Sequence, residues 1–313
     1  IGEVVKEKIR SLESGEILLL DNVRFLEDEA VDKKPEEHKN SSLVRNLSPL
    51  SDVFVNDAFS AAHRSHASIV GFTTQLPSYA GRVIEREVEQ LKGILTTMEI
   101  SEHDSFVLGG AKPRDTLDII DFMLERGVLE RILVSGVVGE LFLIAEGYKL
   151  GSTEDFLRKK NYTESLPQTE ELLKKYGEKI EIPLDVAIET SGKRAEISVE
   201  DLPSDFIISD IGRRTIERYV EVINESVTIG FKGPTGKYEK EEFGVGTRVI
   251  LRTIANSKAK TLVGGGHTLA ALDKFNIDRD KFTHVSLGGG ALIKYLSGKP
   301  MPAIEALKEA AKK

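Results

Sequence analysis

The sequence predicts an α/β fold with two doubly wound parallel-sheet (Rossmann-like) domains that are joined by a long helix. Short apolar runs alternate with helical patterns along most of the chain, and this alternation predicts a mainly parallel sheet covered on both faces. Polar or glycine-rich clusters follow the apolar runs, at the strand ends where such folds bind ligands. Between two sets of strand–helix units, residues 77–98 carry one long helical pattern. The 313 residues suffice for two domains of about 150 residues each.

The composition excludes several classes of protein. The formal net charge of -8 argues against general nucleic-acid or membrane binding. The chain has no cysteine, which excludes a disulfide framework, a cysteine metal site and a thiol nucleophile. No apolar run approaches the roughly 18 residues that a membrane span needs. We therefore expect a cytoplasmic protein that has neither a nucleic-acid nor a membrane partner.

The first part of the chain contains two apolar runs that end in polar clusters. We expect a buried strand at Glu16–Leu20, a helix over 36–50 and a second strand at Asp52–Val55. Residues 61–68 then concentrate two histidines and an arginine among small residues. This part of the chain therefore offers a basic cluster at the end of a strand.

The rest of the chain repeats a strand–helix pattern, with a small antiparallel excursion in its middle. The excursion is the pair of runs Leu184–Ile188 and Ala195–Val199, joined by Thr190–Lys193. Other strands are expected at 106–108, 132–134, 206–208, 227–229, 261–263 and 283–287, and helices after 113, from about 139, over 151–176 with a break at Pro167, and at 214–224, 241–255 and 303–312.

The stretch Lys260–Tyr295 carries the strongest ligand signal. Two apolar runs, Thr261–Val263 and Thr283–Leu287, each lead into three glycines and then into a helical pattern. A strand that opens on glycines and a helix start gathers bare N–H groups in one concavity, which suits an anion. One such triplet is more simply a tight turn. Two in the same frame favour a site for a polyphosphate.

The remaining motifs narrow the chemistry. The patterns GxxxxGK[ST], GxGxxG, HExxH and the EF-hand loop are absent. One lysine, Lys112, lies in a glycine-lined strand end, and a basic group of four side chains lies in the other half of the chain. Two anion sites on two domains, joined by a helix, suggest phosphoryl transfer with domain closure, because that chemistry needs positioning, charge stabilisation and exclusion of water.

Seven motifs, in order along nearly the whole chain, resemble those of phosphoglycerate kinases. The most diagnostic is Asp52–Ser68 (DVFVNDAFSAAHRSHAS), which is similar to the family's DxFVNDAFxxAHRxHAS. His267 stands where bacterial and eukaryotic members have an aspartate, and here the chain resembles archaeal-type members. The other motifs are Asp21–Phe25 (DNVRF), Val107–Lys112 (VLGGAK), Asp210–Gly212 (DIG), Gly233–Glu239 (GPTGKYE), Gly264–Thr268 (GGGHT) and His284–Ala291 (HVSLGGGA).

The resemblance implies reversible phosphoryl transfer between 1,3-bisphosphoglycerate with ADP and 3-phosphoglycerate with ATP, in glycolysis and gluconeogenesis. It implies that the nucleotide carries Mg²⁺, and it assigns neither a protein ligand of the metal nor an oligomeric state. Carried over residue by residue, it implies catalytic roles for Lys112, Gly289 and Gly290, binding of the three-carbon acid by Arg24, His63, Arg64 and His66, and binding of the nucleotide by Gly109, Gly110, Lys112, Gly136, Pro234, Glu239, Gly264, Gly265, Gly266, His267 and Thr268.

The resemblance also predicts how the chain divides. Residues 1–87 would be the remnant of an N-terminal domain that binds 3-phosphoglycerate, and residues 88–297 would form the nucleotide-binding domain. The tail, 298–313, would pack back on the first domain. We expect the first domain to be incomplete, because the family's first strand and its SHLGRP segment have no counterpart here.

Two departures from the family pattern lie in the proposed phosphate region. Thr116 replaces a second lysine that follows Lys112, and Lys232 replaces an asparagine. One alternative is a catalytically impaired nucleotide-binding fragment, and another is an unrelated α/β protein that binds sugar phosphates or acid phosphates. Structural readings also stand beside the functional ones. In these structural alternatives, Arg24 pairs with a nearby carboxylate, His63 and His66 are polar residues whose hydrogen bonds are satisfied within the protein, and Lys112 and Glu239 are solvated.

Overall fold

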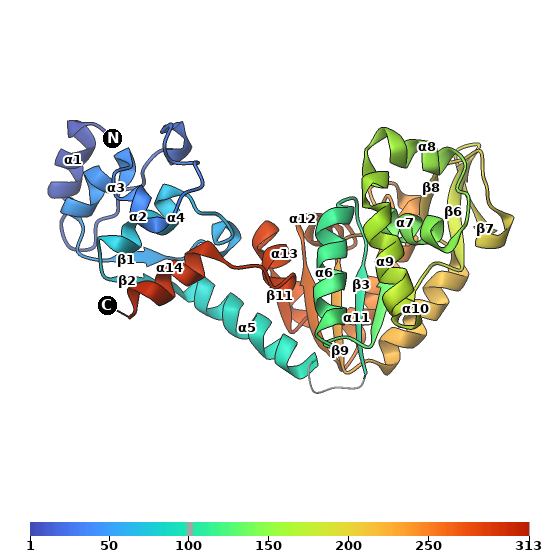
Figure 1. Cartoon of the computed structure of the whole chain (residues 1–313). Helices are drawn as coiled ribbons and strands as arrows, with labels where there is room; N and C mark the ends of the chain where they lie inside the picture. Colours follow the sequence, from blue (N-terminus) through green and yellow to red (C-terminus); the bar gives the residue numbers. More distant parts are fainter. Residues whose placement is uncertain (99–102, 313) are drawn as a thin grey trace. The chain divides into compact units, whose positions relative to one another are not determined.

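The chain divides into two compact units in the computed structural model, which describes residues 1–98 and 103–312 (Figure 1). The first unit comprises Ile1–Glu89 and Lys299–Lys313, and the second comprises Gln90–Gly298. The division falls within helix α5 (Arg82–Met98). The predicted α/β class with parallel sheets is confirmed.

The first unit is built from short elements. Its sheet has two parallel strands, with Phe54 opposite Ser78, which is less than the doubly wound sheet that we expected there. A small core forms around Leu43, Val44 and Phe72. Besides the first part of α5, the elements are α1 (Glu3–Arg10), α2 (Pro35–His38), α3 (Ser42–Leu47), β1 (Phe54–Asn56), α4 (Ala67–Val70), β2 (Ser78–Ala80), α14 (Pro302–Ala310) and short 3₁₀ turns at Val23–Phe25, Ser48–Leu50, Phe59–Ala61 and Gly71–Thr74.

Three predictions for the first unit were wrong. Glu16–Leu20 is not a strand: Ile17 and Leu19 are 92% and 91% exposed, and no strand among the described residues pairs with this run. The helix over 36–50 is broken near Ser41, where the turn between α2 and α3 forms. The long helix begins at Arg82 and not at 77, because Ser78–Ala80 pairs with β1.

The second unit contains a sheet of six parallel strands in the order β11-β10-β9-β3-β4-β5. The chain starts in the middle, at β3, moves outwards to β5 and then returns to β9 on the other side of β3. This is the doubly wound order with its switch point between β3 and β9. The strands are β3 (Asp104–Leu108), β4 (Arg131–Val134), β5 (Ile180–Glu181), β9 (Thr228–Lys232), β10 (Lys260–Gly264) and β11 (His284–Ser286).

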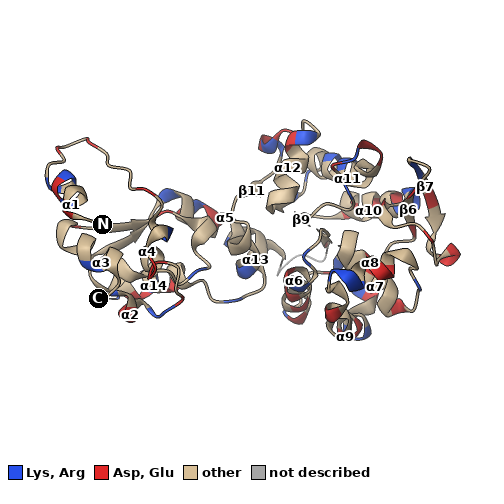
Figure 2. Cartoon of the chain, turned by 90° about the horizontal axis from the view of Figure 1, so that it is seen from above, with Lys and Arg blue, Asp and Glu red and all other residues tan. Residues whose placement is uncertain are grey.

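Two layers of helices cover this sheet, with β9 between them when the unit is seen from above (Figure 2). One layer contains α6, α7 and α9, and the other contains α10, α11 and α12. Buried side chains such as Phe231 and Tyr219 join the second layer to the sheet. The helices are α6 (Pro113–Glu125), α7 (Gly136–Glu146), α8 (Ser152–Lys159), α9 (Leu166–Tyr176), α10 (Arg213–Glu225), α11 (Val245–Asn256), α12 (Gly266–Lys274) and α13 (Gly290–Leu296), and 3₁₀ turns lie at Tyr162–Ser165, Gly177–Lys179, Val199–Asp201, Glu241–Phe243 and Arg279–Lys281.

The predicted antiparallel pair is confirmed as β6 (Asp185–Thr190) and β7 (Lys193–Ser198). The strand expected at 206–208 is β8 (Ile208–Ile211), and it joins this small sheet instead of the parallel one. Pro167 does not break a helix. It lies in the first turn of α9, where the backbone nitrogen has no partner within the helix, so a proline there removes no hydrogen bond. The break in the helix precedes it, at residues 160–165.

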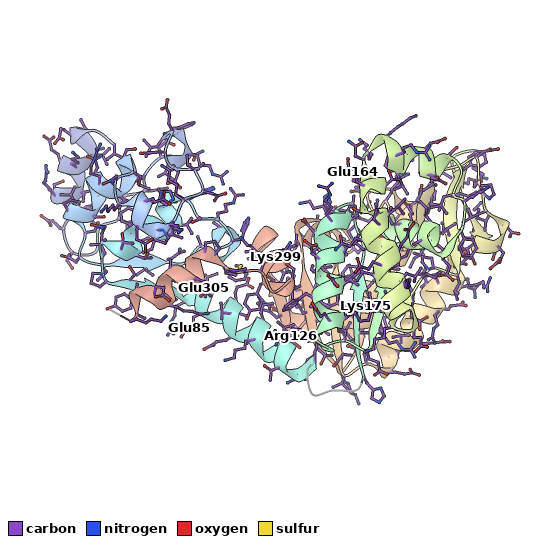
Figure 3. The ribbon with its side chains drawn as sticks, viewed as in Figure 1. Glu85, Arg126, Glu164, Lys175, Lys299 and Glu305 are labelled. Atoms are coloured by element: carbon purple, nitrogen blue, oxygen red, sulfur yellow. The ribbon has the colours of Figure 1, made fainter. Side chains whose placement is uncertain are left out.

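Charged side chains are spread over the surface of both units (Figure 3). Glu85 pairs with Arg82 at 2.8 Å, and Glu305 pairs with Lys308 at 2.9 Å. The guanidinium of Arg126 lies 5.3 Å from the centre of the Phe122 ring. Exposed pairs of this kind contribute little to stability.

Candidate active site

The switch point of the six-stranded sheet is crossed by two glycine-rich loops. The loop after β3 and the loop after β9 are tied by backbone hydrogen bonds: Gly109 N–H donates to the Lys232 carbonyl at 2.9 Å, and Gly110 N–H donates to the Pro234 carbonyl at 2.9 Å. A Cβ on Gly109 would lie 2.6 Å from the Pro234 carbonyl oxygen. The close crossing therefore requires glycine, and it fixes the floor of the site.

A hollow of about 110 Å³, here called the strand-end pocket, lies over this crossing. It gathers the loops after β3, β9, β10 and β11, so the two glycine triplets do meet on adjacent strands, as predicted. The starts of α6 and α12 also border it, and the first N–H groups of a helix have no partner within the helix. Its lining is Gly109, Gly110, Ala111, Lys112, Lys232, Gly233, Pro234, Gly265, Gly266, His267, Thr268, Gly289, Gly290 and Ile293.

Lys112 is the exposed cation of the strand-end pocket. It occupies the N-cap position of α6, directly after the glycine crossing. Among the described residues, no ion pair or side-chain hydrogen bond holds its ammonium group. It is therefore available to an anion in the pocket.

Two residues of the predicted nucleotide group have structural contacts. The Thr268 hydroxyl is fully buried and accepts a hydrogen bond from Gly233 N–H at 2.9 Å, which ties the start of α12 to the loop after β9. Gly264 ends β10 and does not line the pocket. A side chain there would collide with Leu292 of α13, so this glycine lets the helix pack against the strand.

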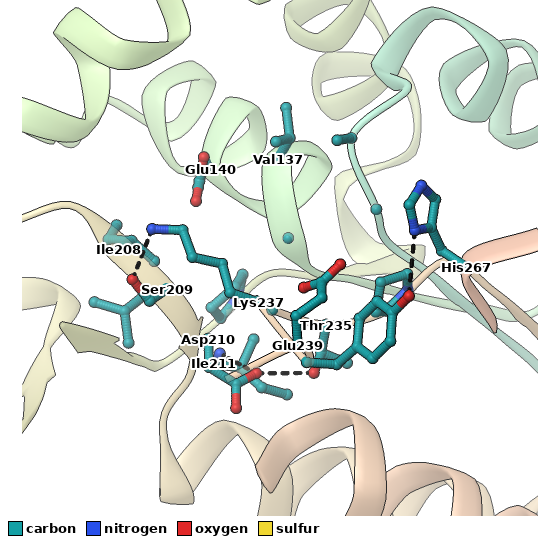
Figure 4. A pocket seen from close by; sticks show the side chains of 18 of the residues that line it. Val137, Glu140, Ile208, Ser209, Asp210, Ile211, Thr235, Lys237, Glu239 and His267 are labelled. Carbon is teal, nitrogen blue, oxygen red and sulfur yellow. Dashed lines mark hydrogen bonds between the residues drawn. The ribbon is translucent and has the colours of Figure 1, made fainter. Parts of the chain in front are cut away.

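A second hollow of about 250 Å³, here called the deep cavity, adjoins the strand-end pocket (Figure 4). Gly110, Ala111, Pro234 and His267 line both hollows. The predicted residues Gly136 and Glu239 line the deep cavity as well. Most of the remaining wall is apolar: Val137, Leu143, Phe156, Pro183, Val186, Ile208, Ile211 and Tyr238.

Glu140 and Lys237 interrupt the apolar wall. Glu140 of α7 is 8% exposed, and its Oε2 forms no hydrogen bond with the described residues. Burial raises the pKa of Glu140 to about 8, and the charge of Lys237 opposes this shift. Figure 4 shows the Glu140 carboxyl and the Lys237 side chain reaching toward each other. The Lys237 ammonium donates to the Ser209 hydroxyl at 2.9 Å, and partial burial lowers its pKa.

A buried network holds the floor of the deep cavity in place. Asp210 accepts hydrogen bonds from Arg194, from the Thr235 hydroxyl and from Gly246 N–H, each at 2.9 Å. The Asp210 side chain is fully enclosed, and these three donors satisfy it together with Ile211 N–H, at 3.0 Å. It therefore acts as a support of the loop that carries Thr235 and Lys237.

The mouth of the deep cavity contains an aromatic pair. The Tyr238 hydroxyl and His267 Nδ1 are 3.4 Å apart, and the two rings meet edge to face with centroids 6.2 Å apart. Glu239 is exposed beside them, and its backbone carbonyl accepts a hydrogen bond from the Lys274 ammonium at 2.6 Å. The Glu239 carboxylate stays at the mouth, where it faces solvent.

The first unit holds the predicted acid-binding residues. His63, Arg64 and His66 lie together between β1 and α4, with Arg64 Nε 3.4 Å from His63 Nε2. His66 is buried, and its Nε2 lies 3.9 Å from the Asp32 carboxylate. Arg24 is exposed on the 3₁₀ turn at Val23–Phe25.

Other residues of the diagnostic motif hold the first unit together. The Asn56 amide donates to the Ile69 carbonyl at 3.0 Å. The Asp57 carboxylate accepts from the N–H groups of Val83 and Ile84 at 2.6 and 3.1 Å, at the start of α5. The motif therefore combines structural residues with candidate ligand residues.

The described residues contain no dedicated metal centre, because no group of three or more histidines and carboxylates gathers among them. Mg²⁺ in phosphotransferases is usually held by one or two carboxylates together with substrate phosphates. The strand-end pocket has no carboxylate in its lining. These side chains therefore do not fit a resident Mg²⁺, and the ion would have to arrive as part of a nucleotide substrate. None of the described helices has the length and apolarity of a membrane span.

Sequence reasoning missed Glu140 and Lys237 and mentioned Lys232 only as a departure from a family pattern. Both Glu140 and Lys232 carry a detectable signal, since each is a charged residue inside an apolar run, GVVGELFL and TIGFK. A charge in a segment that must be buried indicates a functional cavity or a buried pair. Only the structure shows which hollow each side chain lines.

A doubly wound domain whose switch point joins an apolar cavity to a cationic, glycine-lined pocket is typical of α/β proteins that bind anionic ligands at their strand ends. The sequence model of the family "Phosphoglycerate kinase" matches residues 1–299. The phosphoglycerate kinase of Methanopyrus kandleri is 46% identical over 309 residues, which cover 98% of this chain and 75% of that protein. That of Methanothermus fervidus is 43% identical, covering 100% and 75%.

Solved structures agree with these relatives. The crystal structure of phosphoglycerate kinase from Pyrococcus horikoshii superposes with a TM-score of 0.91 at 36% identity, covering 100% of this chain and 77% of that one. The chain belongs to the phosphoglycerate kinase family. It is a transferase of glycolysis and gluconeogenesis that moves a phosphoryl group reversibly between 1,3-bisphosphoglycerate with ADP and 3-phosphoglycerate with ATP. The alternative of an impaired binding protein is not favoured by these matches.

Proposed function

We propose that the second unit binds ADP or ATP, with the nucleoside in the deep cavity and the phosphates in the strand-end pocket. The observation that carries this proposal is the shared wall of the two hollows. One is apolar and the other cationic, and Gly110, Ala111, Pro234 and His267 line both. A nucleoside joined to a polyphosphate has the same division into an apolar and an anionic part.

The residues of the two hollows then take separate roles. Lys112 holds the transferring phosphoryl group, with Gly289 and Gly290 beside it, and Gly265, Gly266, His267 and the bound Thr268 frame the remaining phosphates. Glu239 accepts hydrogen bonds from the ribose hydroxyls at the mouth of the deep cavity. Mg²⁺ enters with the nucleotide and screens its phosphates, since the pocket supplies cations and N–H groups but no carboxylate.

The first unit binds the three-carbon acid through Arg24, His63, Arg64 and His66. Guanidinium groups suit a carboxylate or a phosphate because they offer paired donors. In the direction of ATP synthesis, the bond between phosphorus and the acyl oxygen of 1,3-bisphosphoglycerate breaks, and a bond to the terminal β-phosphate oxygen of ADP forms. The products are a carboxylate and ATP, and no side chain has to be covalently modified. We propose that this reaction takes place in the cytoplasm.

The test is a calorimetric titration of Mg-ADP into the wild type and into two valine variants. Val137→Phe fills the deep cavity, whereas Val227→Phe places the same ring at a position that is 49% exposed. We expect Val137→Phe to lose Mg-ADP binding and Val227→Phe to keep it. A coupled assay with 3-phosphoglycerate tests the first unit, where Arg64→Ala should raise the KM for the acid and leave Mg-ADP binding unchanged. Equal binding by both valine variants would place the nucleoside elsewhere.

A further inference from the structure

Lys232 is a buried lysine at the carboxyl end of β9, on the wall of the strand-end pocket. Its side chain is 6% exposed, and the Thr116 hydroxyl, 3.3 Å from Nζ, is the only hydrogen-bond partner that the described residues offer it. None of the described carboxylates lies within ion-pair distance of Nζ. A buried ammonium group that lacks an anionic partner is unfavourable, so a fold retains it only where something else compensates.

The position of Lys232 indicates what that compensation is. The pocket that it lines also contains Lys112 and the glycines after β10 and β11, and no carboxylate. The Lys232 stem runs beside Gly265, whose Cβ would lie 3.8 Å from the Lys232 Cγ. The two lysines therefore belong to the same hollow, one exposed at its rim and one buried in its wall.

We propose that the Lys232 ammonium binds the terminal phosphates of the nucleotide, as a second catalytic cation beside Lys112. This inference rests on the proposed binding of nucleotide phosphates in the strand-end pocket. The lysine gives up no proton in the transfer. It offsets negative charge that moves between the transferring phosphoryl group and the nucleotide, where a fixed cation stabilises the transition state.

The electrostatics of the pocket agree with this role. Burial lowers the pKa of Lys232 to about 8; the charge of Asp115 opposes this shift, and the charge of Lys112 adds to it. The other ionisable group on the pocket is His267 of α12, while α13 contributes glycines and Ile293. A bound phosphate favours the charged lysine. Nucleotide binding should therefore take up a proton near pH 8.5, and the affinity should fall as the pH rises further.

The experiment compares Lys232→Met with Lys260→Met, a change at the opposite, amino end of the neighbouring strand β10. Titrations with adenosine, ADP and ATP, each with Mg²⁺ where it applies, are made at pH 7.5 and 8.5. We expect Lys232→Met to bind adenosine normally and to bind ADP and ATP roughly 10- to 100-fold more weakly, which is the loss of one charge-assisted hydrogen bond. The kcat should fall as well. Lys260→Met should match the wild type.

The proton is measured by titrating ADP in two buffers with different ionisation enthalpies. At pH 8.5 we expect the wild type and Lys260→Met to take up roughly half a proton or more per ADP. Lys232→Met should lack this uptake. A role of Lys232 in folding alone would change neither the proton count nor the difference between adenosine and ADP.

A double variant, Lys232→Asn with Thr116→Lys, returns the cation from the neighbouring helix α6. Because the Thr116 hydroxyl lies 3.3 Å from Nζ, a lysine at 116 can reach the same volume, and it should recover part of the ADP affinity.

Three results would overturn the proposal. The first is that Lys232→Met binds ADP as tightly as the wild type does. The second is that Lys232→Met fails to fold, which would make the lysine structural. The third is that proton uptake on ADP binding persists in Lys232→Met. A wild type that binds no adenine nucleotide would instead contradict the proposed function itself.

Discussion

Each unit of the molecule contains a helix whose first N–H groups donate to an aspartate carboxylate, but the two aspartates have different surroundings. In the first unit, the exposed Asp57 accepts from two N–H groups at the start of α5. In the second, the buried Asp185 accepts from Arg214 N–H at 2.9 Å and Thr215 N–H at 2.8 Å at the start of α10. In each case the residue before or at the helix start is a glycine, Gly81 or Gly212, on which a Cβ would collide with the aspartate.

The two aspartates differ in what surrounds them. The aspartate of the second unit is buried at the start of β6, where the three-stranded sheet packs against α10, whereas that of the first unit faces solvent beside a two-stranded sheet. The candidate ligand groups follow this contrast only in part. The second unit keeps the charged Glu140 and Lys232 buried inside its hollows, although Lys112 is exposed, and the first unit keeps Arg24 exposed, although His66 is buried. A large core can hold unfavourable buried charges, and a small one can hold few.

The largest expected effect is on the stability of the second unit, which the burial of the Glu140 carboxyl lowers at high pH. The pKa of Glu140 is about 8 in the fold against 4.5 when unfolded. Between these two pH values, the folded unit keeps the Glu140 carboxyl protonated and the unfolded chain does not. The contribution of this proton to the stability of the unit is therefore fully present below pH 4.5 and is lost as the pH rises through about 8. The difference between these two pKa values corresponds to on the order of 5 kcal/mol.

Glu140→Gln removes this proton and should not show that loss. Hydrogen exchange of the α7 amides at several pH values measures the unfolding free energy of the second unit. The gap between variant and wild type should widen from pH 5 to pH 8, and the first unit should be unaffected. A gap that stays constant with pH would mean that the wild-type carboxyl is already ionised in the fold.

Lys112→Ala tests activity apart from stability. Lys112 is exposed and supports no packing, so its loss should not change the unfolding of the second unit. Removing one preorganised cation should lower turnover about 10²–10³-fold, or ~3–4 kcal/mol, with a smaller change in Mg-ADP affinity. Steady-state kinetics with both substrates measure this, and Lys175→Ala, an exposed change on α9, is the control. Turnover near that of the wild type would remove Lys112 from the mechanism.

Asp185→Ala should destabilise the second unit by roughly 2–3 kcal/mol, because it leaves buried donors without an acceptor. The Thr215 hydroxyl, 2.7 Å from the Asp185 carboxylate, loses a partner together with the two N–H groups. Urea unfolding followed by circular dichroism measures the change. A destabilisation as small as that caused by removing an exposed helix cap would show that the donors find other hydrogen-bond partners.

Asp57→Ala should have the smallest effect, about 1 kcal/mol, since the Asp57 carboxylate is exposed and water can satisfy the N–H group of the exposed Val83. Hydrogen exchange of the first turn of α5 reports it locally. The same measurement compares the two units, and amides of β1 should exchange through openings of lower free energy than those of β9. Slower exchange in β1 than in β9 would reverse the comparison.

Local patterns in the sequence were enough to predict the alternation of strands and helices in the second unit and the meeting of the two glycine triplets. Both follow from local patterns: apolar runs form strands, glycines open them, and consecutive βα units place their strand ends at one edge of a sheet. The family motifs were equally readable, because they are contiguous stretches such as Asp52–Ser68.

Tertiary structure alone decided the features that depend on partners distant in sequence. Glu16–Leu20 has the composition of a strand, yet a strand forms only where another one pairs with it, and none of the strands in the described part of the chain does so. Residues 208–211 extend the antiparallel β6 and not the parallel sheet, since pairing is set by packing and not by composition. Glu140 and Lys232 became parts of a site only when α7 and β9 placed their side chains in shared hollows, because a pocket is lined by segments that the sequence keeps far apart.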